Sequence, residues 1–254
     1  MKLEDLLPFA VPVAFFTFWA SEVLVNRLGG GRPFEKVGGW VLVGVGFFLV
    51  TMTINVTAPL WLPPEWIASH RLMDMTRLGL WGAVPAFLLG SLVSYWFHRC
   101  EHRFDAMWRG LHQMHHSIER VDMPGWAVGH PLEGLVFTAI TTLVPMFVFG
   151  IDPVAAALAG TVSTVLNMVE HWNVPTPRWL GYVVQRPEQH CLHHERDVHA
   201  RNYGGDIVLW DMLFGSYENP QRFDGKVGFG HSSIRALPAM FAFADVNVRR
   251  SDQQ

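Results

Sequence analysis

The chain has 254 residues, half of them hydrophobic and only 16% charged. This composition, with a mean hydropathy of +0.19, is too apolar for an ordinary water-soluble domain and indicates a membrane protein. A formal net charge of −3 with no basic tract argues against a nucleic-acid partner. The two cysteines, Cys100 and Cys191, are too few for a disulfide framework and fit a reducing, cytosolic environment.

Three apolar segments are long enough to cross a bilayer, which takes about 20 residues of helix. They cover residues 8–28, 37–62 and 78–97. The first is preceded by more acidic than basic side chains and followed by no small-residue cleavage pattern, so we expect a retained helix and not a secretory signal peptide. The glycine-rich connector at 27–36 indicates a turn, because it does not match the phosphate-binding GxxxxGK[ST] pattern.

Two further apolar runs, 132–150 and 153–169, contain no Lys or Arg and are joined by a short turn. They predict a helical hairpin that enters the membrane and returns to the same side. Basic residues are concentrated in the connector and after residue 98, so the positive-inside tendency places both regions in the cytosol. The predicted fold is all-α: an integral-membrane, multi-pass bundle of about three spans plus a helical hairpin, with a cytosolic, histidine-rich helical cap.

Eight of the thirteen histidines fall into three short blocks with the spacings HxxxH, HxxHH and HxxHH. Residues three or four positions apart lie on one face of a helix, so each block directs two or three imidazoles towards one point. Neutral imidazole binds iron, zinc and copper, and eight such ligands suggest two ions. The blocks are His98 and His102; His112, His115 and His116; and His190, His193 and His194.

Other kinds of metal protein match this pattern less well. Structural zinc sites use four ligands, often cysteines, and eight histidines exceed that need. The zinc-protease motif HExxH begins at His194 but fails, because Val198 stands where its second histidine would be. A metal transporter needs polar ligands in mid-membrane, where the central parts of residues 41–60 and 80–97 offer only Thr, Ser and Asn55.

The chain resembles the fatty acid hydroxylase/sterol desaturase superfamily of integral-membrane diiron oxygenases. The resemblance covers residues 80–220 and rests on motifs that occur in the family's order. These motifs are the three histidine blocks, His130-Pro-Leu-Glu133, Glu170-His171-Trp-Asn173, Asn202-Tyr-Gly204 and Trp210-Asp-Met-Leu-Phe-Gly215.

The resemblance implies an oxidoreductase in which two histidine-bound iron ions activate O2 and hydroxylate or desaturate a C–H bond of a membrane lipid, of the sterol or fatty acyl type. The implied iron ligands are the eight histidines of the three blocks together with His171. No catalytic group beyond the metal centre is expected. Outer residues that orient the ligand imidazoles are expected among His130, Glu133, Glu170, Asn173 and Asp211. For His130, a role in starting an apolar helix is equally open.

Three regions are expected: membrane spans and connectors in 1–77, the diiron catalytic domain in 78–220 and a C-terminal tail in 221–254. The chain contains no haem-attachment, iron–sulfur or dinucleotide-binding motif, so the electrons must come from a separate carrier protein. The alternative function is a histidine-rich membrane protein that binds or transports metal without redox catalysis.

Several residues receive minor roles. His70 and His231 match no motif and are expected at the surface, whereas His199 lies close enough to the last block to stay undecided. The cysteines are expected to be small packing residues. The docking candidates for the electron carrier are Arg186, Arg196 and Arg201.

Overall fold

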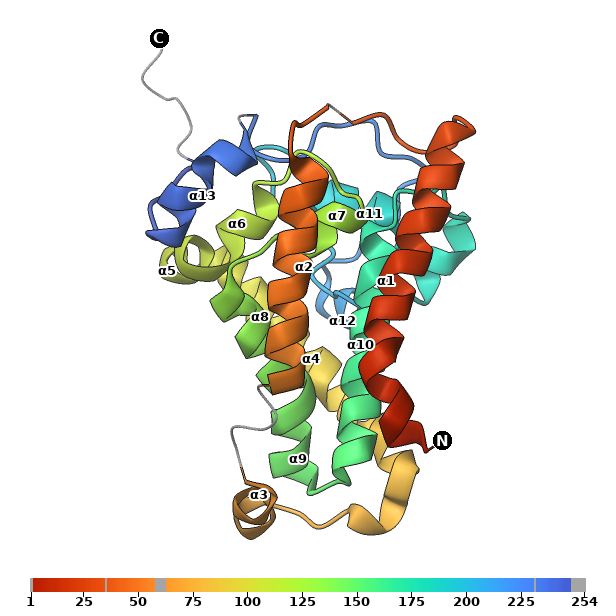
Figure 1. Cartoon of the computed structure of the whole chain (residues 1–254), viewed down its shortest axis with the longest axis vertical. Helices are drawn as coiled ribbons and strands as arrows, with labels where there is room; N and C mark the ends of the chain where they lie inside the picture. The colour runs from red at the N-terminus through yellow and green to blue at the C-terminus, as the bar shows by residue number, and fades with distance from the viewer. Residues whose placement is uncertain (1, 35, 58–62, 231, 248–254) are drawn as a thin grey trace.

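The computed structural model describes residues 2–34, 36–57, 63–230 and 232–247. In these ranges long helices form an elongated bundle, and shorter helices cover one end of it (Figure 1). The long elements are α1 (Leu3–Arg27), α2 (Trp40–Thr57), η2 (Thr76–Gly82) continuing into α4 (Ala83–Arg103), the run of α8 (Pro131–Thr138), η4 (Ala139–Leu143) and α9 (Val144–Phe149), and α10 (Pro153–His171). The all-α prediction is confirmed.

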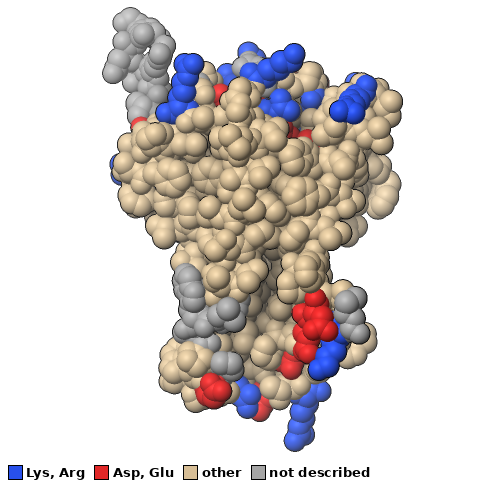
Figure 2. Space-filling model, viewed as in Figure 1, with Lys and Arg blue, Asp and Glu red and all other residues tan. Residues whose placement is uncertain are grey.

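Five helical runs in the described ranges are long and apolar enough to cross a membrane. The shortest has 18 residues, which at 1.5 Å per residue spans about 27 Å, close to the thickness of a hydrocarbon core. Figure 2 shows the matching surface: charged side chains gather at the two ends of the face in view, and an almost uncharged belt separates them. The predicted spans and hairpin are therefore present, although residues 58–62 of the second predicted span lie outside the described residues.

The hairpin between α9 and α10 is fixed by its turn. Gly150 has a φ of +56°, and a Cβ built on it would lie 2.1 Å from the carbonyl oxygen of Met73, so only glycine fits. Asp152 then caps α10, because its Oδ1 accepts a hydrogen bond from the backbone N–H of Val154 at 2.8 Å. Pro153 occupies the first turn, where its missing N–H costs nothing.

The cap consists of short helices, most of which lie beside the upper halves of α1 and α2 in Figure 1. Its elements are α5 (Asp105–Met107), η3 (Trp108–His112), α6 (Gln113–His116), α7 (Met123–Trp126), η5 (Arg178–Tyr182), α11 (Pro187–His193), α12 (Leu209–Phe214) and α13 (Ser233–Phe241). At the opposite end lies α3 (Pro64–His70), which packs against α9.

The N-terminal spans pack directly on the rest of the molecule. Phe15 of α1 is fully buried with Phe48, Trp126 and Met168, which belong to α2, α7 and α10. Gly44 lets α2 approach α7 closely, since a Cβ there would lie 2.5 Å from the carbonyl oxygen of Pro124. Residues 1–77 therefore share a core with the later helices, and the division at residue 77 stays a prediction.

Candidate metal centre

The three predicted histidine blocks and His171 meet where the bundle joins the cap. The first block lies in the last turns of α4, as expected for a helix that continues past its span; the second lies on η3 and α6, and the third on α11 and its C-cap. His171 ends α10. The nine imidazoles form two sets, within each of which the ligand atoms lie no more than 4.8 Å apart. The five-histidine set is His98, His102, His112, His116 and His193, and the four-histidine set is His115, His171, His190 and His194.

Ring nitrogens of the five-histidine set stand at the spacing of ligands around one ion. The Nε2 atom of His98 lies 2.9 Å from that of His112, 3.1 Å from that of His193 and 3.3 Å from that of His102. Two ligands that are each about 2.1 Å from a metal and at right angles to each other are about 3.0 Å apart. The observed spacing therefore leaves room for a metal at the centre of the set.

The four-histidine set shows the same spacing and has unused nitrogens. The Nε2 atoms of His171 and His190 are 2.8 Å apart. Neither ring nitrogen of the buried His194 has a hydrogen-bond partner among the described residues, and the same holds for Nδ1 of His171. Buried polar atoms are rarely left unpaired, so these orphan nitrogens fit a bound cation.

Backbone carbonyls fix the tautomers of three ligands. Nδ1 of His98 donates to the carbonyl oxygen of Tyr203 at 2.7 Å, and Nδ1 of His193 donates to that of Arg201 at 2.6 Å. Nδ1 of His115 donates to Val128 at 3.1 Å. With the proton held on Nδ1, the lone pair of each ring lies on Nε2 and points into its set, as metal ligation requires.

Carboxylates surround the outer nitrogen of His112. Its Nδ1 lies 2.5 Å from Oε1 of Glu133, one of the expected outer residues, and 3.7 Å from Oε2 of Glu101. Glu101 is fully buried, and neither of its oxygens has a hydrogen-bond partner among the described residues. Because Nε2 of His112 already faces His98, we treat both carboxylates as outer partners that orient this imidazole.

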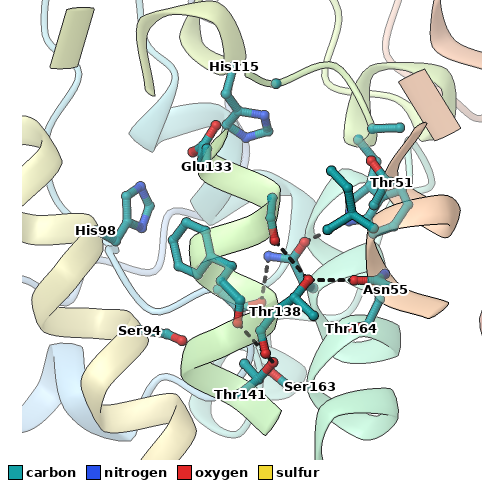
Figure 3. Close-up of a pocket in the computed structure, with 18 of the residues that line it drawn as sticks. Thr51, Asn55, Ser94, His98, His115, Glu133, Thr138, Thr141, Ser163 and Thr164 are labelled. Carbon is teal, nitrogen blue, oxygen red and sulfur yellow. Dashed lines mark hydrogen bonds between the residues drawn. The ribbon is translucent and has the colours of Figure 1, made fainter. Parts of the chain in front are cut away.

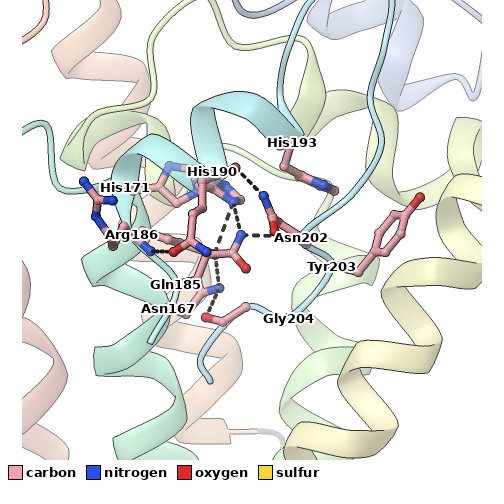
Figure 4. A network of polar contacts seen from close by, with 12 residues as sticks. Asn167, His171, Gln185, Arg186, His190, His193, Asn202, Tyr203 and Gly204 are labelled. Carbon is pink, nitrogen blue, oxygen red and sulfur yellow. Dashed lines mark hydrogen bonds and ion pairs between the residues drawn. The ribbon is translucent and has the colours of Figure 1, made fainter. Parts of the chain in front are cut away.

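Two more of the expected outer residues lie near the ligands. Oε2 of Glu170 and Nε2 of Gln185 are each 3.1 Å from Nδ1 of His190 (Figure 4). Asp211 acts indirectly. It accepts hydrogen bonds from the backbone N–H groups of Tyr203, at 2.7 Å, and Gly204. It therefore holds in place the loop that contains the carbonyl of Tyr203, to which His98 donates.

Asn173 was expected beside the ligands but forms its side-chain bonds elsewhere. Its Oδ1 accepts from the backbone N–H of Arg32 and its Nδ2 donates to the carbonyl of the same residue, both at 3.1 Å. This pair of bonds ties the glycine-rich connector to the end of α10. The side chain thus stabilises the packing of the first spans.

Burial keeps the cap imidazoles neutral. It lowers the pKa of His115 to about 4, although the bond to the carbonyl of Val128 partly opposes the shift. Burial likewise holds the pKa of His116, His190, His193 and His194 well below the usual range, and neighbouring imidazoles lower it further. Neutral imidazoles can bind a metal near pH 7 without first losing a proton.

The remaining histidines take other places. His130 starts α8, since its Nδ1 accepts from the backbone N–H of Leu132 at 3.2 Å, and its side chain also lines the cavity described below. His199 lies against the five-histidine set, with Nδ1 3.1 Å from Nδ1 of His116. His70 is exposed on α3 at the opposite end. His231 lies outside the described residues.

The prediction that Arg186 helps to dock the electron carrier is wrong. Arg186 is only 1% exposed, because its guanidinium is enclosed by Glu188, Thr176 and Asn219. Arg201 is exposed and pairs with Glu218, and Arg196 bonds to backbone carbonyls of residues 227 and 228. Cys191 is a buried packing residue, as expected.

A cavity of about 200 Å³ leads from the histidines into the bundle. His98, His112, His115 and His190 line one end of it, and α2, α4, α8 and α10 form its walls. Figure 3 shows Thr138, Thr141, Ser163 and Thr164 on the side away from His115. These hydroxyls bond to protein acceptors, for example Thr138 to Oδ1 of Asn55 at 2.6 Å, so the polar atoms do not prevent an alkyl chain from entering.

The sequence pattern that defines the fatty acid hydroxylase family matches residues 83–216, more than half of the chain and all nine clustered histidines. The chain belongs to the fatty acid hydroxylase family. No solved structure matches the chain.

The curated proteins that are similar to this chain include lipid-modifying enzymes. The human alkylglycerol monooxygenase is 29% identical over 226 residues, which cover 85% of this chain and 49% of that protein. An ornithine lipid hydroxylase from Rhizobium tropici is 27% identical over 62% of this chain and 51% of its own length. A sphingolipid C4-hydroxylase from Schizosaccharomyces pombe is 24% identical over 54% of this chain and 47% of its own. The chain spans about half the length of the curated relatives it matches.

Some residues that contact the clustered histidines were not predicted from the sequence. Glu101 could have been, because it stands three positions after His98 and shares its helical face. His199 was left undecided, and only the fold shows that it reaches the second block. Val128, Arg201 and Tyr203 act through backbone carbonyls, which carry no side-chain signal in a sequence.

Proposed function

We propose that this protein is an O2-dependent iron oxygenase that hydroxylates a C–H bond of a membrane lipid. The observation that carries the proposal is the cavity that begins at both histidine sets and continues between the membrane spans. A lipid chain can reach such a cavity without leaving the membrane. Metal transport is less well supported, because the histidines lie together at the C-terminal ends of α4 and α10 and on the cap helices.

Two irons are the proposed cofactor, one in each set. When bound, they would supply the electrons and the reactive oxygen that a C–H bond of an alkyl chain requires. The chain's own residues would hold the imidazoles in one tautomer, keep the site dry and direct the lipid towards it. The cavity has a volume of only about 200 Å³, so we propose that a single alkyl segment enters it and that the rest of the lipid stays outside.

Hydroxylation is preferred to desaturation because the named relatives are an alkylglycerol monooxygenase, an ornithine lipid hydroxylase and a sphingolipid C4-hydroxylase. Inserting one oxygen atom from O2 and reducing the other to water takes two electrons and two protons. We propose that a separate carrier protein delivers the electrons at the cap. The cap is proposed to face the cytosol, since basic residues gather at that end of the molecule (Figure 2).

The test is expression of the chain in a host that lacks it, followed by mass spectrometry of total lipids under 16O2 or 18O2. The proposal predicts a lipid that is heavier by one oxygen and that gains about two further mass units under 18O2. A His193→Ala variant should make no such product. Lipid profiles identical with and without the chain, or a product without 18O, would contradict the proposal.

The orientation needs its own test. A cysteine placed at exposed Arg235 on α13 should react with a membrane-impermeant maleimide only after the cells are opened, whereas one at exposed Arg77 in η2 should react in intact cells. The reverse pattern would put the cap outside.

A further inference from the structure

A second concave site lies on the outside of the bundle, away from the histidines. It is a groove of about 900 Å³ between the cap-side halves of α1 and α2. Figure 1 shows the two helices standing apart at this level, with α7 between them and the connector passing over the top. Pro124 of α7 lines the groove, and the same residue packs closely against Gly44 of α2.

We propose that this groove binds one anionic phospholipid, with the phosphate at its upper rim and an acyl chain between the two helices. The rim carries Arg27, in the last turn of α1, and Lys36, in the connector. Both side chains are exposed, and neither has an ion pair or side-chain hydrogen bond among the described residues. Two free cations at the edge of an uncharged belt form a site for a lipid phosphate.

The acidic residues of the groove are already engaged and do not cancel these charges. Glu22 is only 3% exposed, and its Oε2 accepts from the backbone N–H groups of Met123 and Asn173, both at 3.0 Å. Asp122 is 1% exposed and accepts from Trp40, Gly125 and Arg120. The surface that a ligand would meet is therefore basic at the rim.

Below the rim the walls are apolar and face outwards. Val23 of α1 and Val41 and Leu42 of α2 are all exposed large hydrophobic residues. The partly exposed Trp19 of α1 also lines the groove, and tryptophan is enriched where hydrocarbon meets head groups. A cationic rim above a hydrocarbon-lined groove, at the depth of the membrane interface, matches the two ends of an anionic phospholipid.

The test is native mass spectrometry of the full, iron-loaded chain in detergent, titrated with phosphatidylglycerol or with phosphatidylcholine of the same acyl chains. We expect one phosphatidylglycerol to bind about 25-fold more tightly than phosphatidylcholine, because each of the two basic residues near the surface contributes about fivefold. Equal dissociation constants for the two lipids would overturn the proposal.

Two variants locate the site. Arg27→Gln combined with Lys36→Gln should weaken phosphatidylglycerol binding by about fivefold for each charge lost, and should leave phosphatidylcholine binding unchanged. The matched control is Arg222→Gln combined with Lys226→Gln, which removes the same two residue types from exposed cap positions outside the groove. If the control weakens binding as much as the groove variant, the cap attracts anionic lipid only by its overall charge, and the proposal is wrong.

A third variant tests the acyl-chain part without changing any charge. Leu42→Trp should fill the groove and weaken the binding of both lipids. Iron content and melting temperature without added lipid report whether the variants are folded. Phosphatidylglycerol bound by Leu42→Trp as tightly as by the parent chain would contradict a chain seated between α1 and α2.

Discussion

The two histidine sets differ in how they are held. In the five-histidine set, outer nitrogens bond to fixed acceptors: His98 and His193 to carbonyls, and His112 to Glu133. In the four-histidine set, the outer nitrogens of His115 and His190 also have partners, but Nδ1 of His171 and both nitrogens of His194 have no hydrogen-bond partner among the described residues. The first set is therefore preorganised by the protein, whereas the second depends on its metal for part of its order. One site should bind iron more firmly than the other.

The largest effect is expected from removing a ligand from either set. His193→Ala and His115→Ala should each lower activity by more than about a hundredfold, because even outer partners of metal ligands typically contribute 10–100-fold. Iron content should fall as well, while membrane insertion and detergent extraction stay normal. Either variant with full activity would show that its histidine is not a ligand.

The number of irons bound per chain tests whether the two sets hold their metals differently. His194→Ala leaves three imidazoles in its set, whereas His102→Ala leaves four. We expect about one iron per chain in the first variant and a value between one and two in the second, measured by plasma mass spectrometry after purification. Equal iron loss from the two variants would mean that the sets are held alike.

A smaller effect is expected from the outer residues. Glu133→Gln removes the charged acceptor from His112 and should weaken iron binding or activity by about 10–100-fold. Asn173→Ala is the matched comparison, because that side chain bonds to the connector at Arg32. It should lower the melting temperature and leave the iron affinity of the folded protein unchanged. A loss of iron affinity in Asn173→Ala would place it nearer the centre than its bonds indicate.

The smallest effect is expected at His70. Its ring lies on α3, bonded to Trp66 and Ser69 at the end of the bundle opposite the cap. His70→Ala should therefore keep both iron and activity within experimental error. A loss of activity in this variant would mean that the centre has been assigned to the wrong end of the bundle.

The sequence was informative where function depends on the spacing of side chains. The blocks at His98, His112 and His190 and the five apolar runs follow helical periodicity, so the bundle and most of the centre could be predicted. The assignment of ligands to sets could not. His115 and His116 are neighbours in the chain and serve different sets, because successive residues on a helix point about 100° apart.

Long-range placement was equally beyond the sequence. Asn173 and Glu133 were predicted for the same role, and only the packing of the connector against α10 separates them. From the sequence, Arg186 was expected at the surface, yet its side chain is enclosed by residues 176, 188 and 219. These contacts depend on which loops come together in the folded chain, and a local sequence pattern does not contain that information.

The most direct test of the account is an experimental structure of the iron-loaded protein with anomalous scattering measured at the iron edge. We expect two iron peaks, one inside the five-histidine set and one inside the four-histidine set, each about 2.1 Å from imidazole nitrogens. A single peak, or iron bound away from these histidines, would contradict it.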